Sequence, residues 1–134
     1  MQGNEKILFL AEGQMGDLIL LTPALHALKK KFPDCRITVL LMHRRYYSAQ
    51  TEPGPEIFHT RFETTSQVLL NNPDVDEILE LNRNALKKLK GFKRLAAELK
   101  CIRQIRKMKF DSAVCTFPQS RLIIWSFLAG IKKE

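Results

Sequence analysis

Short apolar runs alternate along this chain with segments in which apolar residues recur every three or four positions. The runs cover residues 6–11, 36–41, 77–81 and 110–117. Continuous apolar runs suit strands that are covered on both faces. Strands that alternate with helices indicate a parallel sheet built from crossover connections. The sequence therefore predicts an α/β fold: a Rossmann-like parallel sheet with flanking helices, in which ligands bind at the carboxyl ends of the strands.

The first helical segment contains Pro23, which would damage the interior of a helix. Thr22 can act as an N-cap, with Pro23 as the first helical residue. We therefore expect a short helical turn from Gly16 and a kink or restart at Pro23. Residues 43–62 are expected to form a long loop, and residues 64–71 a short helix.

Two further helices are expected in the second half of the chain. The first covers residues 85–108, as one helix or as two joined near Gly91. Its apolar face contains Leu86, Leu89, Phe92, Leu95, Leu99, Ile102 and Ile105. The last helix is expected to be capped near Ser120, to end at Gly130 and to hold Trp125 and Phe127 in the core.

Charge is concentrated in one segment of the 134 residues, whose formal net charge is +8. Residues 83–109 carry eleven lysines and arginines and one acid, Glu98. This basic helix face has three interpretations: a solvated surface, a contact with an anionic membrane, or a nucleic-acid surface. We rank nucleic acid last, because no recognition module or stacking aromatic residues accompany the charge.

The length of the chain suits a single domain, residues 1–134. There is no secretory signal pattern and no apolar stretch of membrane-spanning length, so we expect a cytoplasmic protein. The three cysteines are interpreted as structural, and no metal-ligand spacing is present. A dinucleotide fingerprint and a P-loop are also absent, so no cofactor is predicted.

A loop with two glycines and an acid joins the first strand to the first helix, in the sequence AEGQMGD. Gly13 and Gly16 are expected to let the backbone turn tightly and approach a ligand. Asp17 is a candidate general base that would take a proton from a hydroxyl group. The alternative is that Asp17 only caps the helix.

Other candidate binding residues follow later strands. Arg44 begins the long loop after the second strand, and Ser120 and Arg121 follow the fourth. An arginine at this edge can bind a phosphate or carboxylate in a bidentate manner. For Arg44 the alternative is a solvated loop, and for Ser120 it is a helix cap.

The segment KILFLAEGQMGDLILLTPALHALKKKFPDCRITVL resembles the N-terminus of glycosyltransferase family nine, the lipopolysaccharide heptosyltransferases. The shared features are the Gly-Asp pair at residues 16 and 17 and the T-P-A-L block at residues 22–25. NNPDVDEILEL and FDSAVCTFPQSRLIIWSFLAGIKK resemble later segments of the same family. Many members carry an arginine before Gly-Asp, and this chain has none there.

The resemblance implies the N-terminal, acceptor-side half of a two-domain GT-B glycosyltransferase. Such an enzyme transfers heptose from ADP-heptose to a lipopolysaccharide inner-core acceptor, without a metal, and Asp17 corresponds to its catalytic base. The family continues into a donor-binding C-terminal domain beyond the point where this sequence stops. The isolated chain is therefore expected to be inactive, with an uncovered apolar surface that favours self-association.

Two other classes of function compete with this interpretation. One is a non-catalytic α/β binding or regulatory domain, similar in outline to a response-regulator receiver. A receiver needs an aspartate at the end of its third strand, where this chain has ELNR. The other is a basic module that binds anions or nucleic acid.

Overall fold

The computed structural model describes residues 4–12, 15–42, 58–59, 69, 71–81, 86, 88–116 and 120–131. Five strands and three helices lie in these ranges. The strands are β1 (Lys6–Glu12), β2 (Arg36–Met42), β3 (Phe58–His59), β4 (Glu77–Leu81) and β5 (Ser112–Cys115). The helices are α1 (Met15–Lys31), α4 (Phe92–Met108) and α5 (Ser120–Leu128).

The strands form one sheet in the order β3-β4-β2-β1-β5. β1, β2, β4 and β5 are parallel, as predicted, with Ile7 opposite Ile37 on one side and opposite Ser112 on the other. The two-residue β3 pairs antiparallel with β4 and lies in the segment predicted to be a loop. The α/β fold with a parallel sheet is therefore confirmed, and β3 is a short addition at its edge.

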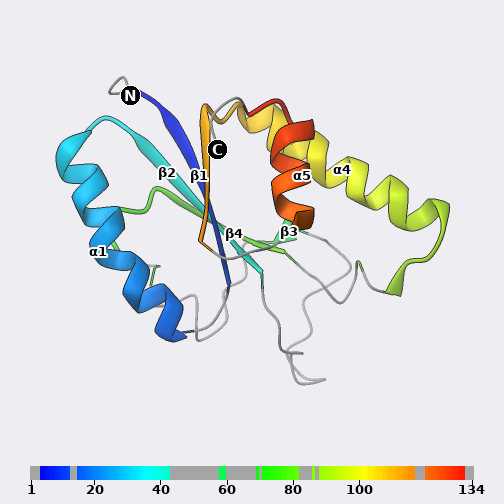
Figure 1. Cartoon of the computed structure of the whole chain (residues 1–134), viewed down its shortest axis with the longest axis horizontal. Coiled ribbons are helices and arrows are strands. Elements are labelled where there is room, and N and C mark those ends of the chain that lie inside the picture. The colour runs from blue at the N-terminus through cyan, green and yellow to red at the C-terminus, as the bar shows by residue number, and fades with distance from the viewer. Residues whose placement is uncertain are drawn as a thin grey trace.

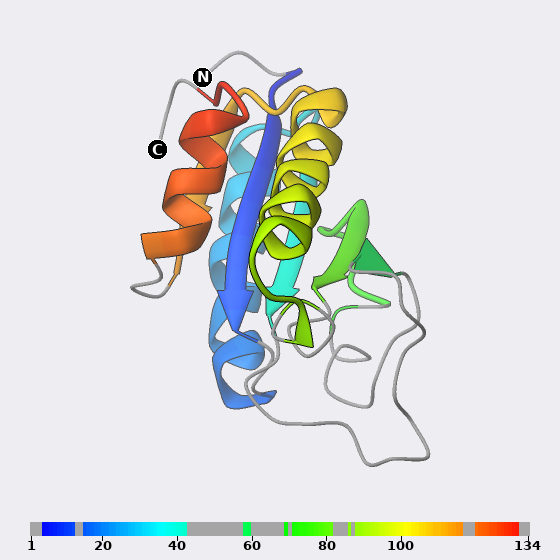
Figure 2. The ribbon, with the colours of Figure 1, turned by 90° about the vertical axis from the view of Figure 1, so that its right-hand side faces the viewer.

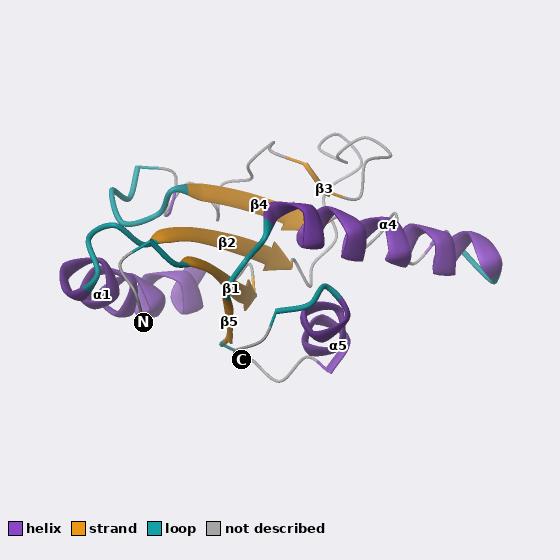
Figure 3. Ribbon diagram, turned by 90° about the horizontal axis from the view of Figure 1, so that it is seen from above, coloured by secondary structure: helices purple, strands orange, loops and turns teal. Residues whose placement is uncertain are grey.

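Helices cover both faces of the sheet, which makes three layers (Figures 1 and 3). The strand period of two turns Leu8 and Leu10 to the face that carries α4 and α5, where Ile102 and Trp125 are buried. Ile7 and Phe9 point to the opposite face, into a second core with residues of α1. In Figure 2 the two helices α4 and α5 flank β1, and α1 lies behind the sheet.

Helix α1 is continuous through Pro23, so of the predicted kink or restart at this residue the restart is wrong. A proline has no N–H to donate to the carbonyl four residues earlier, which here belongs to Ile19. The hydroxyl group of Thr22 donates a hydrogen bond of 2.7 Å to this same carbonyl. Thr22 therefore satisfies the carbonyl that Pro23 leaves unpaired, and it does not act as an N-cap.

Helix α4 begins after Gly91, which has a positive φ of 61°. Leu86 and Lys88 are helical and residues 89–91 are not, which agrees with the second of the two predicted alternatives, two helices joined near Gly91. The predicted apolar face divides, because Ile102 and Ile105 are buried whereas Phe92 is 90% exposed. Figures 1 and 3 show the reason: the first half of α4 extends beyond the sheet, and only its second half lies against it.

The last helix, α5, also departs from the prediction at one aromatic residue. Trp125 is buried in the core as expected, but Phe127 is 72% exposed, so its assignment to the core is wrong. The two residues are two positions apart, and on a helix such residues point to different sides. An apolar helix therefore does not bury all of its apolar residues, because only one of its sides faces the core.

Candidate functional site

The carboxyl edge of the sheet contains a topological switch point. Among the parallel strands the order is β4-β2-β1-β5, so the chain moves away from β1 on one side and returns to its other side for β5. The helices that follow β1 and β5 lie on opposite faces of the sheet. In open α/β sheets, ligands bind outside the carboxyl ends of the strands at such a point. The residues after β1 and β5 are therefore the candidates for a site.

Asp17 is the third residue of α1 and lies in its first turn, close to the carboxyl end of β1. Its side chain is exposed. The unpaired N–H groups at a helix N-terminus favour a negative charge in this position. Within the described part of the chain, no hydrogen bond or ion pair engages its carboxylate, so the group is available to a ligand.

Gly16 has a different role in the structure from the one predicted. It lies inside the first turn of α1 and not in a tight turn, and its φ is not in the left-handed region. A Cβ atom built at this position would meet nothing within 4 Å. The expected backbone freedom is therefore not needed, and what the glycine does provide is open space beside Asp17. Gly13 and Arg44 lie outside the described residues.

Ser120 and Arg121 begin α5, on the other side of the switch point. Thr116, which follows β5, is tied to β1, because both its backbone N–H and its hydroxyl group donate to the carbonyl of Leu10, at 3.0 and 2.9 Å. Ser120 is exposed and is the first residue of the helix. These two bonds fix the end of β5 to β1 at the carboxyl edge.

Arg121 already has an anionic partner, which the sequence analysis did not assign. Its Nε atom lies 3.7 Å from Oε1 of Glu98 on α4, and the same oxygen lies 3.5 Å from Nε of Arg94. The spacing of four residues between Arg94 and Glu98 was the available sequence signal, since such pairs meet on a helix. An anionic ligand that binds Arg121 would therefore compete with Glu98.

The acidic residues at the opposite, amino edge of the sheet are used differently. Asp76 accepts hydrogen bonds from the backbone N–H of Ile37 at 2.7 Å and from the ammonium group of Lys29 at 2.9 Å. Burial acts to raise the pKa of Asp76, but the hydrogen bond from Ile37 and the charge of Lys29 outweigh it, so the pKa lies below its usual value. Asp111 accepts from the backbone N–H of Lys6 at 2.9 Å. These carboxylates hold the strands in place.

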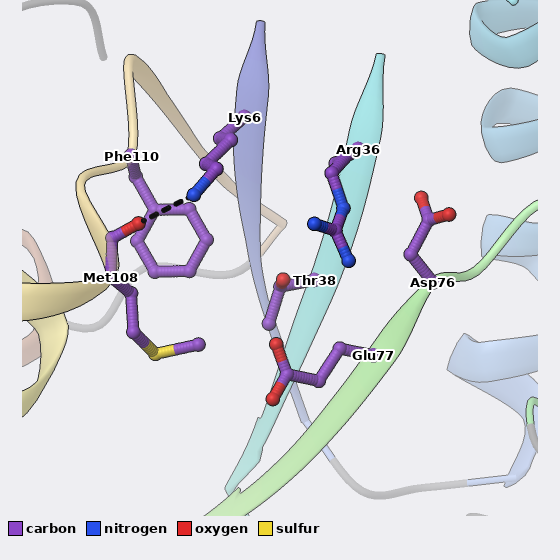
Figure 4. A pocket seen from close by; sticks show the side chains of 7 residues that line it. All are labelled: Lys6, Arg36, Thr38, Asp76, Glu77, Met108 and Phe110. Atoms are coloured by element: carbon purple, nitrogen blue, oxygen red, sulfur yellow. Dashed lines mark hydrogen bonds between the residues drawn. The ribbon is translucent and has the colours of Figure 1, made fainter. Parts of the chain in front are cut away.

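A small pocket of about 130 Å³ also lies at the amino edge. Figure 4 shows it between the starts of β1, β2 and β4, where the ammonium group of Lys6 donates to the carbonyl of Met108 at 3.3 Å. Its volume corresponds to about four water molecules. Two acids balance its two cations, and it lies at the end of the sheet away from Asp17. The pocket is lined by Lys6, Arg36, Thr38, Asp76, Glu77, Met108 and Phe110.

The described cysteines are all free thiols. Cys35 and Cys101 are buried free thiols, and Cys115 is half-buried. Burial raises the pKa of Cys101 to about 12. In the described ranges, no group of three histidine, cysteine, aspartate or glutamate side chains gathers where it could hold a metal ion. None of the described helices is long and apolar enough to span a membrane.

Fold and site together define a Rossmann-like α/β domain with an exposed carboxylate at the switch point of its sheet. No protein-family model matches the chain, and no curated protein sequence is significantly similar to it. A solved structure is similar: the crystal structure of the glycosyl transferase family 9 protein from Veillonella parvula DSM 2008, with a TM-score of 0.62 and 20% sequence identity. The match covers 98% of this chain and 31% of that one. At this identity the likeness shows a shared fold.

Proposed function

We propose that the chain is the acceptor-side domain of a glycosyltransferase of the lipopolysaccharide heptosyltransferase type. The observation that carries the proposal is the placement of Asp17, an exposed carboxylate in the first turn of the helix that follows β1, at the switch point of the sheet. Two further points support it. The Gly-Asp and T-P-A-L segments resemble that family, and the fold matches part of a glycosyl transferase family 9 structure.

In this proposal Asp17 acts as the general base of the transfer. The acceptor's hydroxyl oxygen forms a bond to the anomeric carbon of the heptose, while the bond from that carbon to the diphosphate oxygen of ADP-heptose breaks. The electron pair leaves with the nucleoside diphosphate, and the acceptor proton moves to the Asp17 carboxylate. A base positioned in this way contributes about 10²- to 10⁴-fold to a reaction rate.

The binding of the acceptor is assigned to the other side of the switch point. Inner-core acceptors are anionic, and the guanidinium group of Arg121 can bind a phosphate or carboxylate through two N–H groups. Ser120 offers a hydroxyl group beside it. In such an enzyme a donor-binding half would supply ADP-heptose. We further propose that the protein works in the cytoplasm.

A titration with a water-soluble inner-core acceptor, freed of its acyl chains, tests the binding step on this chain. We expect the backbone amide signals of Asp17, Ser120 and Arg121 to shift in the nuclear magnetic resonance spectrum. The signals of Lys6, Ile37 and Asp111, at the opposite edge, serve as an internal control and should stay in place. Shifts confined to the amino edge, or no saturable shift at all, would contradict the proposed acceptor site.

A further inference from the structure

Polar side chains gather at the amino edge of the sheet, on the face that carries α4. In the register of the sheet, Lys6 of β1 lies opposite Arg36 of β2. Two residues further along β2, Thr38 lies opposite Glu77 of β4. Alternate residues of a strand point to the same face, so Arg36 and Thr38 share the side of the buried Leu40. These four polar side chains line the pocket of about 130 Å³ that Figure 4 shows.

The hydroxyl group of Thr38 is buried and unpaired in the described part of the chain. Only 5% of Thr38 is exposed, and its hydroxyl group forms no hydrogen bond with a described residue. Leu8 and Leu40, which lie further along on the same face, are apolar. Buried polar groups are nearly always paired, because an unpaired one costs stability. A ligand in the pocket would supply the partner that Thr38 lacks.

Three charged groups around the pocket are also available to a ligand. The guanidinium group of Arg36 and the carboxylate of Glu77 form no ion pair or hydrogen bond within the described ranges, and both residues are exposed. The ammonium group of Lys6 uses one of its three N–H groups for the carbonyl of Met108, which leaves two. The carboxylate of Asp76, by contrast, is already bonded to β2 and α1.

The available groups are separated by sign. Lys6 and Arg36 are neighbours at one level of the sheet, and Glu77 lies beside Thr38 at a second level on the same face. The two levels are two residues apart, which is about 7 Å along the strands. In Figure 4 the two cationic groups lie at one end and the carboxylate of Glu77 at the other, with Thr38 between them. The pocket therefore offers donors to an anionic group at one end and acceptors to a cationic group at the other.

We propose that this pocket binds a small α-amino acid in its zwitterionic form. The carboxylate of the ligand accepts hydrogen bonds from the guanidinium group of Arg36 and the ammonium group of Lys6. The ammonium group of the ligand donates to the carboxylate of Glu77 and to the hydroxyl oxygen of Thr38. Hydrogen bonds between charged groups are the strong ones, and an arginine adds geometric specificity for a carboxylate.

The size and lining of the pocket restrict the side chain of the ligand. The volume corresponds to about four water molecules, so only a molecule of a few non-hydrogen atoms fits. Phe110 is buried, Met108 is half-buried, and Figure 4 shows both on one side of the pocket. This apolar wall suits a short aliphatic side chain, and alanine is the simplest amino acid that has one.

Other occupants fit the pocket less well. An inorganic anion such as phosphate would find donors in Lys6 and Arg36 but would lie close to the carboxylate of Glu77, and like charges repel. A cation alone would meet the same difficulty with the two basic groups. Water would pair with the hydroxyl group of Thr38, but separated charges of both signs are not needed to hold it. A zwitterion uses all of these groups at once.

The proposal does not depend on the proposed function, because the pocket and Asp17 lie at opposite edges of the sheet. An amino acid bound here would contact three neighbouring strands: β1, β2 and β4. A ligand that binds only the folded chain stabilises it by mass action. The bound amino acid would therefore raise the stability of the fold without touching the candidate acceptor site.

Calorimetric titration of the 134-residue chain with L-alanine tests the proposal. Propionate, which lacks the ammonium group, and ethylamine, which lacks the carboxylate, are the comparison ligands. We expect a dissociation constant on the order of 1 mM for alanine, as befits a ligand of few atoms. Each comparison ligand should bind at least ten-fold more weakly, because it loses one set of charged hydrogen bonds. No saturable binding of alanine, or tighter binding of propionate or inorganic phosphate, would overturn the proposal.

Thr38→Val separates a binding role from a structural one. Valine has nearly the same shape but no hydroxyl group. Because that hydroxyl group has no partner among the described residues, stability in urea should stay the same or rise. The affinity for alanine should fall about ten-fold, since a hydrogen bond to a charged group is lost. A loss of stability with an unchanged affinity would show that Thr38 serves the fold and not a ligand.

The charged ends of the pocket are tested at two exposed residues, whose replacement preserves the fold. Glu77→Gln should weaken the binding of alanine about ten-fold and leave that of propionate unchanged or tighter, whereas Arg36→Gln should weaken both. Arg103 of α4 is an exposed arginine that does not line the pocket, so Arg103→Gln is the matched control. An equal loss in Arg103→Gln, or normal binding of alanine by Glu77→Gln, would overturn the assignment to this pocket.

Discussion

The two edges of the sheet use aspartate in opposite ways. At the amino edge, Asp76 and Asp111 each accept a hydrogen bond from a backbone N–H at the start of a neighbouring strand, at 2.7 and 2.9 Å. At the carboxyl edge, Asp17 is exposed in the first turn of α1 and contacts no described polar group. The difference teaches that a carboxylate committed to the backbone holds the fold together, whereas an uncommitted carboxylate can meet a substrate.

The comparison predicts its largest effect at Asp17, in an enzyme that joins this domain to a donor-binding half. Asp17→Asn removes the base and preserves the shape of the side chain. We expect turnover to fall about 10²- to 10⁴-fold, with the donor affinity little changed. Steady-state kinetics and donor titration measure the two quantities. Near-normal turnover would remove Asp17 from the mechanism.

The same substitution at Asp76 should change stability. Asp76→Asn loses the ion pair with Lys29 and weakens the bond to the N–H of Ile37, so we expect a loss of about 1–3 kcal/mol in the free energy of unfolding. Urea denaturation measures it. Asp17→Asn is the matched control, and its cost should stay below about 1 kcal/mol, because only a helix-terminal charge is removed.

The pH dependence of stability gives a second measurement on Asp76. Its pKa is lower in the folded chain than in the unfolded chain, so its contribution is present above the unfolded value of about 3.9. This contribution is lost as the pH falls through the lower native pKa. Between neutral pH and about pH 3, Asp76→Asn should therefore lose less stability than the unmodified chain. Identical acid profiles would show that Asp76 carries no such linkage.

Asp111 provides an intermediate case at the amino edge. Its bond to the N–H of Lys6 is exposed to solvent. Water can replace part of this bond, so Asp111→Asn should cost about 0.5–1.5 kcal/mol, less than the same change at Asp76. Urea denaturation of the two variants under one set of conditions ranks them. A larger loss of stability in Asp111→Asn than in Asp76→Asn would show that Asp111 is the stronger anchor.

The smallest effect is expected at Glu98, a carboxylate that is paired with Arg121 of the candidate site. Glu98→Gln removes the anion that Arg121 faces at 3.7 Å. Exposed pairs of this kind contribute at most about 1 kcal/mol, so the affinity for an anionic acceptor should rise by up to about five-fold. Calorimetric titration measures this affinity. Arg121→Ala is the control in which the affinity should fall. Weaker binding in Glu98→Gln would show that the pair positions Arg121 for its ligand.

The sequence patterns predicted the four parallel strands correctly. They did not predict features that depend on where an element lies in the fold. The four parallel strands follow from continuous apolar runs, and Asp17 was placed at the carboxyl edge by its position after the first of them. Phe127 and Phe92 were not placed correctly, because helical spacing shows which residues share a side and not how far the sheet extends beneath that side. The Thr22 hydroxyl satisfies the carbonyl that Pro23 leaves unpaired within α1, and a propensity argument overlooks this contact.

The same limit applies to the residues that anchor the site. The two bonds from Thr116 to the carbonyl of Leu10 join positions that are 106 residues apart, and no local pattern indicates such a contact. The partner of Arg121 also lies on a different helix. Spacing along one element predicts neighbours on that element, but contacts between elements depend on how the chain returns to the sheet.

The central strand β1 has a consequence for how the protein is made on the ribosome. One of its partners is β2, and the other is β5. On the β5 side, Ile7 can pair with Ser112 only after Ser112 has been synthesised. At a synthesis rate of about 5–20 residues per second, roughly 5–20 s pass between the two. During this time one edge of a nearly all-apolar strand remains unpaired, and such an edge recruits other strands. The nascent chain should therefore need protection from aggregation until β5 emerges.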